Sequence, residues 1–236
     1  PRLMPAERGA IQDICYGSLR HLGRLENVLK QLVAKPIANP EVRTLLLATL
    51  YQLEYTAAAP YAVVHHAVDC ATQLGGRTVK PFVNAVLRTY QRKRSLVLTA
   101  ADKTQSGKFS FPDWWIEQLR QELPASAERI MELANRQPPM TLRVNRRRCT
   151  VQEYLIMLTS VGQAGTVIDD SAIILLRPVA VLKLPGFREG LVSVQDAGAQ
   201  WAARLLDLKK GMRVLDACAA PGGKTAHICE LEETEL

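Results

Sequence analysis

The sequence lacks the features that would indicate a membrane, secreted or metal-binding protein. Among its 236 residues no apolar run reaches the roughly 20 residues that a membrane-spanning helix needs. The N-terminal residues show no basic segment followed by an apolar one, so no secretory signal is indicated. The five cysteines are odd in number and form no C-x-x-C pair, which favours neither a disulfide framework nor a zinc site. We therefore expect a cytoplasmic globular protein with reduced thiols and without membrane contact or bound metal.

Acidic residues are scarce in the first part of the chain. Residues 1–98 hold 13 Lys and Arg against 6 Asp and Glu, whereas residues 99–236 hold 17 of each kind. The formal net charge of +7 therefore arises entirely from the first part. This imbalance favours contact with a polyanion, most simply nucleic acid. A helical domain that happens to be basic explains the charge equally well, and composition leaves both interpretations open.

Apolar residues recur at helical spacing from Glu7 to Arg94. Proline and glycine interrupt the pattern, with breaks expected at Lys35-Pro36, Asn39-Pro40, Pro60 and Gly75-Gly76. Pro81 suits the first turn of a last helix. We predict an all-α bundle over residues 1–98, followed over residues 99–136 by a linker and connecting helices, because the apolar periodicity fades between Ser95 and Pro112.

Beyond Pro138-Pro139 the apolar period changes to two, which is typical of strands. Strands are predicted over residues 141–145, 165–168, 173–177 and 191–194. Thr150 and Glu153 have the spacing of a capping box, which predicts a helix between the first two strands. A small α+β subdomain over residues 137–196 follows. The turn Arg146–Arg148 has the charge to bind phosphates, but a solvated turn is equally plausible.

The last 40 residues are predicted to run helix, strand, loop and helix. An amphipathic helix over Trp201–Leu208 precedes an apolar strand, Met212–Asp216, and a loop of small residues then opens into a new helix near Thr225. This order is typical of the start of a doubly wound α/β sheet. Residues 197–236 are therefore predicted to begin a Rossmann-like domain, and the whole chain to be multidomain.

The loop between Asp216 and Thr225 is compatible with several ligands. A phosphate-binding P-loop requires G-x-x-x-x-G-K-[ST], and Cys218 occupies the place of its first glycine. A dinucleotide-binding turn requires G-x-G-x-x-G, which is also missing. Small side chains, two glycines and the start of a helix still suit close approach of a nucleotide-like cofactor. The first turn of an S-adenosylmethionine-dependent methyltransferase is the third interpretation.

The run Leu215-Asp-Ala-Cys-Ala-Ala-Pro-Gly-Gly-Lys-Thr225 resembles the cofactor loop of the RNA 5-methylcytosine methyltransferases, the Sun family. Three upstream segments resemble further motifs of that family: Gln137–Asn145, Leu184–Phe187 and Val194–Gln200. The front of the chain resembles NusB-type RNA-binding bundles through Tyr16–Arg20 and Val83–Arg88. Together these resemblances cover nearly the whole chain.

The resemblance implies an enzyme that uses S-adenosylmethionine to form 5-methylcytosine in 16S ribosomal RNA, working as a monomer. Cofactor binding is carried over to seven residues: Cys218, Ala219, Ala220, Pro221, Gly222, Gly223 and Lys224. Lys224 is expected to face the cofactor's carboxylate, and Asp216 to brace the loop. The family's two catalytic cysteines lie in Pro-Cys and Thr-Cys pairs after later strands, and none of the five cysteines here fits, so the catalytic residues stay unassigned. A chain that ends before those strands leaves one alternative, a non-catalytic NusB-like RNA-binding or antitermination factor.

Overall fold

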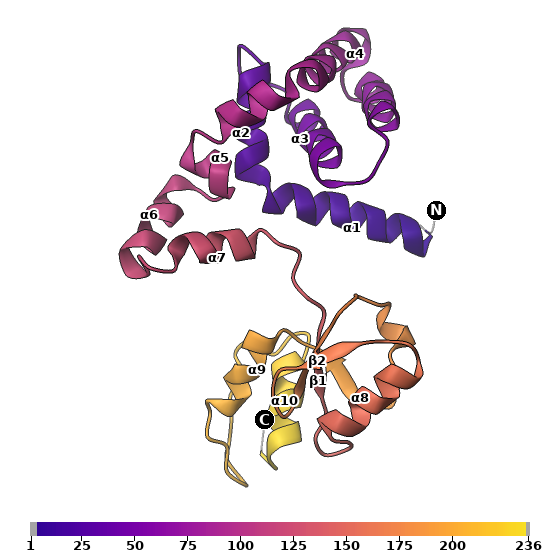
Figure 1. Cartoon of the computed structure of the whole chain (residues 1–236), viewed down its shortest axis with the longest axis vertical. Coiled ribbons are helices and arrows are strands. Elements are labelled where there is room, and N and C mark those ends of the chain that lie inside the picture. Colours follow the sequence, from indigo (N-terminus) through magenta and orange to yellow (C-terminus); the bar gives the residue numbers. More distant parts are fainter. Residues whose placement is uncertain (1–3, 235–236) are drawn as a thin grey trace. The chain divides into compact units, whose positions relative to one another are not determined.

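The protein is described by a computed structural model that covers residues 4–234, apart from the side chains of residues 5, 6 and 75–77. The chain divides after Gln137 into two compact units, a helical one and one that contains a sheet (Figure 1). We call them the helical unit and the sheet unit. None of the described helices is long and apolar enough to cross a lipid bilayer.

The helical unit consists of one bundle followed by three short helices. Its elements are α1 (Pro5–Arg20), α2 (Leu22–Leu32), α3 (Pro40–Tyr55), α4 (Pro60–Ala101), α5 (Gln105–Phe109), α6 (Asp113–Glu122) and α7 (Ala127–Ala134). Helices α3 and α4 both begin at a proline. Proline has no backbone N–H, and this suits a first turn because its N–H groups have no acceptor within the helix. The Asn39 side chain caps α3 by accepting hydrogen bonds from two backbone N–H groups.

The bundle core is almost entirely apolar and comes from α2, α3 and α4. Leu25, Leu46, Leu50 and Leu87 are each at most 1% exposed. A second, smaller cluster joins α5, α6 and α7, where Phe109 packs with three buried residues: Ile116, Ala127 and Met131. The predicted all-α front part and the connecting helices within residues 99–136 are confirmed.

Two predictions for the helical unit are wrong. Helix α4 passes through Gly75-Gly76 and Pro81, where a break and a new helix were expected. Its Ala71 and Val83 are both buried in the bundle core, and that burial outweighs the cost of about 1 kcal/mol for each helical glycine. Pro81 lacks an N–H and favours a bend, and Figure 1 shows that α4 changes direction along its length.

The predicted linker is also helical at its start. Residues 95–101 continue α4 because Val97 and Ala101, four residues apart, are both buried in the bundle core. Thr104 then caps α5 with its hydroxyl oxygen, which accepts from the Gly107 N–H at 3.0 Å. Only a few residues between Asp102 and Asp113 are therefore irregular.

The sheet unit has a four-stranded antiparallel sheet in the order β2-β3-β1-β4. Its elements are β1 (Thr141–Val144), α8 (Val151–Ser160), β2 (Gly165–Val167), β3 (Ala172–Leu175), the short 3-10 helix η1 (Val181–Lys183), β4 (Val192–Val194), α9 (Ala197–Arg204) and α10 (Gly223–Leu231). The four predicted strands up to residue 194 are confirmed, each with slightly different ends. The Thr150–Glu153 capping box is confirmed as the start of α8.

Both faces of this sheet are covered. Side chains alternate along a strand, so Leu142 and Val144 face α8, whose Tyr154 and Leu158 belong to the same core cluster. Thr141 and Arg143 point to the opposite face, where α9 packs against β1 and against α10. Figure 1 shows α8 on one side of the strands and α9 with α10 on the other.

Two details near the end of the chain differ from the prediction. Helix α9 begins at Ala197 and not near Trp201, because the Asp196 carboxylate accepts from the Gly198 N–H at 2.8 Å and caps the helix there. Residues 212–216 form no strand and have a single bridge at Arg213. A strand needs a neighbour along its whole edge, and no strand among residues 4–234 lies beside this segment.

Candidate functional site

The small-residue loop that follows Asp216 leads directly into α10. The Asp216 carboxylate accepts a hydrogen bond from the Cys218 N–H at 2.9 Å and another from the Thr225 hydroxyl at 2.7 Å. These two bonds, first the one from Thr225, hold the pKa of Asp216 below its usual value. Asp216 therefore joins both ends of the loop, as the sequence predicted.

The start of α10 is open. Gly222 has φ 103°, a left-handed conformation that favours glycine, and a Cβ added there would meet no heavy atom within 4 Å. No side chain of the described residues caps this helix. The first N–H groups of a helix have no partner within the helix and carry partial positive charge, so this end can accept an anionic group.

The structure places all seven predicted cofactor residues on this one loop and its helix start. Cys218, Ala219, Ala220 and Pro221 are exposed, while Gly222, Gly223 and Lys224 are partly exposed. The Lys224 ammonium lies 3.7 Å from the Cys218 Sγ atom. The residues are thus brought together, and their role in binding a cofactor stays a prediction.

Sequence reasoning missed Arg143, which is 0% exposed at the centre of the sheet. Its guanidinium donates to the Gly223 carbonyl oxygen at 2.6 Å and to the Gln195 Oε1 atom at 2.6 Å. It also donates to both carboxylate oxygens of Glu230, at 3.0 and 2.7 Å. Strand alternation puts Arg143 on the face away from α8, and only the structure reveals that α10 covers that face.

The three arginines after β1 bind protein groups. Arg147 donates to the Glu230 carbonyl oxygen at 3.0 Å and Arg148 to the Glu189 carbonyl oxygen at 2.7 Å. Arg146 forms an ion pair with Asp170. The turn is therefore attached to neighbouring parts of the sheet unit, and its contact with phosphates stays a prediction.

A buried polar network surrounds α9 and α10. His227 on α10 is 2% exposed, and its pKa falls to about 4 because of burial, followed by repulsion from Arg143 and Arg204. Arg204 on α9 donates to Asp169 at 3.0 Å and to the Ser171 hydroxyl at 2.7 Å. Arg204 therefore attaches α9 to the turn between β2 and β3, while the neutral imidazole of His227 lies buried on α10.

The cysteines do not form a reactive centre in the described residues. Cys149 is buried, and burial raises the pKa of its thiol, which disfavours the nucleophilic thiolate. The other four thiols are free and exposed, and only Cys218 lies on the loop. No group of His, Cys, Asp and Glu within residues 4–234 is arranged to hold a metal ion.

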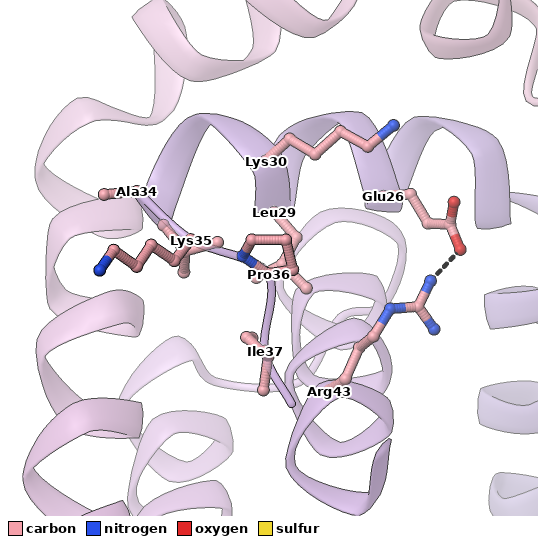
Figure 2. A pocket seen from close by; sticks show the side chains of 9 residues that line it. Glu26, Leu29, Lys30, Ala34, Lys35, Pro36, Ile37 and Arg43 are labelled. Atoms are coloured by element: carbon pink, nitrogen blue, oxygen red, sulfur yellow. Dashed lines mark hydrogen bonds and ion pairs between the residues drawn. The ribbon is translucent and has the colours of Figure 1, made fainter. Parts of the chain in front are cut away.

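The helical unit contains a separate hollow of about 400 Å³ between α2, α3 and the connection that joins them (Figure 2). Leu29, Pro36 and Ile37 supply apolar walls. Figure 2 shows Arg43 turned toward Glu26, with which it forms an ion pair, while the amino group of Lys35 points to the opposite side.

The start of α10 has the features that a carboxylate group of a ligand, such as that of the expected S-adenosylmethionine, requires. The open space above Gly222 leaves room for a ligand against the backbone, and the uncapped start of α10 matches a carboxylate. The Lys224 ammonium lies beside that end of the helix and adds positive charge. The donor set is thus suited to an amino-acid carboxylate.

Three protein-family models match successive parts of the chain. Residues 1–92 match the NusB family, residues 111–182 match the "Methyltr_RsmF/B-like, ferredoxin-like domain", and residues 203–236 match "16S rRNA methyltransferase RsmB/F". The candidate loop lies within the third match. The bundle of the helical unit lies largely within the first.

Curated relatives are similar over nearly the whole chain. Ribosomal RNA small subunit methyltransferase B of Serratia proteamaculans is 41% identical over 95% of this chain and 53% of its own length. The protein of the same name from Pasteurella multocida is 44% identical over 93% of this chain and 49% of its own length. The chain thus spans about half the length of the curated relatives it matches.

A solved structure has the same fold at lower sequence similarity. The crystal structure of PH0851 matches with a TM-score of 0.71 and 23% identity, over 97% of this chain and 53% of that one. At this identity the likeness concerns the fold alone.

Proposed function

We propose that this chain, which belongs to the RsmB/F-like methyltransferase family, is part of an enzyme that transfers a methyl group from S-adenosylmethionine to C5 of a cytosine in 16S ribosomal RNA. The observation that carries the proposal is the open, uncapped start of α10 behind a loop braced by Asp216. The names of the curated relatives supply the substrate class, ribosomal RNA of the small subunit.

In this proposal each loop residue has a defined task. The backbone from Cys218 to Gly223 lies against the methionine end of S-adenosylmethionine, which supplies an electrophilic methyl group when bound. The N–H groups at the start of α10 and the Lys224 ammonium neutralise its carboxylate. Asp216 keeps the loop in the binding conformation, because its carboxylate holds both ends. A thiolate that adds to C6 of cytosine would activate C5, and no cysteine of this chain has that role.

We further propose that residues 212–231 form the first strand, loop and helix of a Rossmann-like domain. The loop and the helix are present as such a unit requires, and the strand segment has a single bridge, at Arg213. The exposed Leu215 side chain, 90% accessible, is the kind of residue that a neighbouring strand and covering helix would bury.

The helical unit is proposed to bind RNA. Lys30, Lys35, Arg88 and Lys93 are exposed and form no ion pair with any residue from 4 to 234. Free cations of this kind can contact phosphates and release counterions. The excess of positive charge in residues 1–98 supports this part of the proposal.

The proposal is tested by methyl transfer in the complete gene product that contains this chain. Tritiated S-adenosylmethionine is supplied with unmodified 30S-derived RNA, and the product nucleoside is identified by chromatography. Labelled 5-methylcytidine is expected. RNA binding without any transfer would overturn the proposal and favour the non-catalytic alternative.

A matched pair of glycine variants connects that activity to the loop. Gly222→Ala strains a φ of 103° and fills the space intended for the cofactor, so cofactor affinity should fall by about tenfold or more. Gly162→Ala strains a φ of 73° in an equally open position at the end of α8 and should leave affinity unchanged. Equal loss in both variants would indicate that the loop is not the binding site.

A further inference from the structure

We infer that Arg143 is a positioning residue that fixes the start of α10, and with it the conformation of the cofactor loop. This inference rests on the proposed function for its consequence but not for its geometry. It assigns a role to a residue of the small antiparallel sheet, outside the loop that would touch the cofactor. Arg143 itself contacts no part of the open space above Gly222.

The guanidinium of Arg143 contacts four residues, which lie in two segments far from β1 in sequence. It reaches the Gly223 carbonyl oxygen in the first turn of α10 and the Glu230 carboxylate two turns later. It also reaches Gln195 just after β4, and the Ser193 hydroxyl within that strand at 3.5 Å. Strand β1 is paired on both sides, so the backbone that carries Arg143 is rigid. The planar guanidinium group therefore restricts the position of α10.

Electrostatics argue that the geometry serves a purpose beyond stability. A cation beside the N-terminal turn of a helix is opposed by the partial positive charge of the free N–H groups there. A buried guanidinium also costs desolvation energy, and an apolar pair at the same position would stabilise equally well or better. The Glu230 carboxylate offsets this charge from the same helix face. What the arrangement supplies, and an apolar pair would not, is a directed bond to the Gly223 carbonyl group.

Arg147 strengthens the same connection from the other end of α10. Its Nε donates to the Glu230 carbonyl oxygen at 3.0 Å. A cation at the C-terminal end of a helix is favourable, so this second contact is stabilising. Helix α10 is thus attached to β1 at its start and to the turn after β1 at its end. These contacts fix the direction in which the preceding loop enters the helix.

Arg204 offers a matched control within the same unit. It binds two acidic residues and a serine hydroxyl, Asp169, Asp170 and Ser171, at 2.6–3.0 Å. Its bonds attach α9 to the β2–β3 turn, and within residues 4–234 it makes no hydrogen bond to the loop or to α10. Replacing it removes a similar number of charge-assisted bonds without releasing Gly223.

The test compares Arg143→Gln, Arg143→Lys and Arg204→Gln in the complete gene product. Hydrogen exchange is measured at the amides that begin α10, including that of Ala226, which donates to the Gly222 carbonyl oxygen at 2.8 Å. Affinity for S-adenosylmethionine is measured by calorimetry, and methyl-transfer assays give KM for cofactor and RNA together with kcat. Thermal unfolding records the general loss of stability in each variant.

In both Arg143 variants the amide hydrogens at the start of α10 should exchange about tenfold faster or more. The same variants should bind S-adenosylmethionine about 10- to 100-fold more weakly. KM for RNA and kcat should change less, because the bond positions the cofactor and not the base. The lysine variant should fail like the glutamine variant, since an ammonium cannot form the fork. Arg204→Gln should lower the unfolding temperature without these changes.

The exchange measurement decides the inference even if the proposed function fails. If the protein without substitutions binds no S-adenosylmethionine, the proposed function is overturned. Faster exchange confined to the Arg143 variants would still support the positioning role. Unchanged exchange in both Arg143 variants would overturn the inference. The inference would also be overturned if Arg204→Gln raised the exchange rate and lowered the affinity as much as the Arg143 variants do, at a similar loss of stability.

Discussion

The two units bury different kinds of side chain. The bundle of the helical unit has a core of leucine, valine and alanine with two tyrosines, Tyr51 and Tyr90, and its buried polar residues among those described are Asn27 and Thr49. The sheet unit buries six polar or charged residues: Thr141, Arg143, Ser171, Gln195, Gln200 and His227. Most of these lie on the face covered by α9 and α10, whereas the face covered by α8 is apolar.

The difference follows from what each unit has to hold in place. Helices satisfy their own backbone groups, so the bundle can be assembled by apolar packing, which is non-directional. The loop before α10 requires a defined direction, and hydrogen bonds supply direction. In the sheet unit the same buried polar residues therefore stabilise the fold and hold the proposed binding site. The apolar core of the helical unit stabilises its fold alone.

The largest effect is expected where a buried ion pair is broken. Arg143→Met leaves the Glu230 carboxylate, whose side chain is 15% exposed, without its partner and should destabilise the sheet unit by about 3–5 kcal/mol. Adding Glu230→Gln should restore a large part of that loss. Urea unfolding followed by Trp201 fluorescence, in a Trp114→Phe/Trp115→Phe background, measures both. A double variant as unstable as the single one would contradict the ion-pair explanation.

A core truncation in the bundle gives the apolar counterpart. Leu46, on α3, is 0% exposed, and Leu46→Ala should cost the helical unit about 3 kcal/mol through lost contacts and a cavity. The loss should be the same at pH 7 and pH 5, since no titrating group is involved. Urea unfolding followed by Trp115, which stacks on Phe111 with ring centroids 4.4 Å apart, reports on this unit. A strong pH dependence of the loss would argue against purely apolar packing.

Acid should weaken the sheet unit through His227. Its folded pKa of about 4 lies below the ordinary histidine value of 6.5, so the unfolded chain binds a proton more readily as pH falls. The stabilisation is complete above about pH 6.5 and is lost as pH falls toward 4, with about 2 kcal/mol lost between pH 7 and pH 5. Urea unfolding at both pH values, on the wild type and His227→Phe, measures this difference. The variant should lose much less, and an equal loss would exclude His227 as the cause.

The smallest effects are expected at the helix caps, where the two units are alike. Asn39→Ala removes the cap of α3, and Thr150→Ala removes the cap of α8. Each should cost about 1 kcal/mol in its own unit, because one or two backbone N–H groups lose their acceptor. The same two tryptophan reporters check this. Destabilisation of the wrong unit by either variant would contradict the division after Gln137.

Much of the fold could be predicted because local patterns and local forces agree. Thr150 and Glu153 predict the start of α8 from their spacing alone, and the alternation around Leu142 predicts β1. The continuation of α4 through Gly75-Gly76 could not be predicted, since it depends on core contacts made by residues on both sides. Tertiary packing overrides a local signal of about 1 kcal/mol per glycine.

The candidate site was only half visible in the sequence. That residues 218–224 lie on one loop could be predicted because they are contiguous, and the bracing role of Asp216 follows from its place before that loop. Arg143 could not, because its partners lie 50 to 87 residues further along the chain and no local pattern connects them. The strand predicted over residues 212–216 needs a pairing partner, which local sequence does not reveal.

The central position of β1 determines when the sheet unit can be completed during synthesis. Although β1 is the first strand to leave the ribosome, it lies between β3 and β4, and Arg143 meets Glu230 only 87 residues later. Long loops must close before such contacts form, which slows folding compared with the local contacts of a helical bundle. The helical unit can therefore fold cotranslationally while the arginine is still unpaired. The nascent chain thus has a built-in order, in which the helical unit matures before the part proposed to hold the methyl donor.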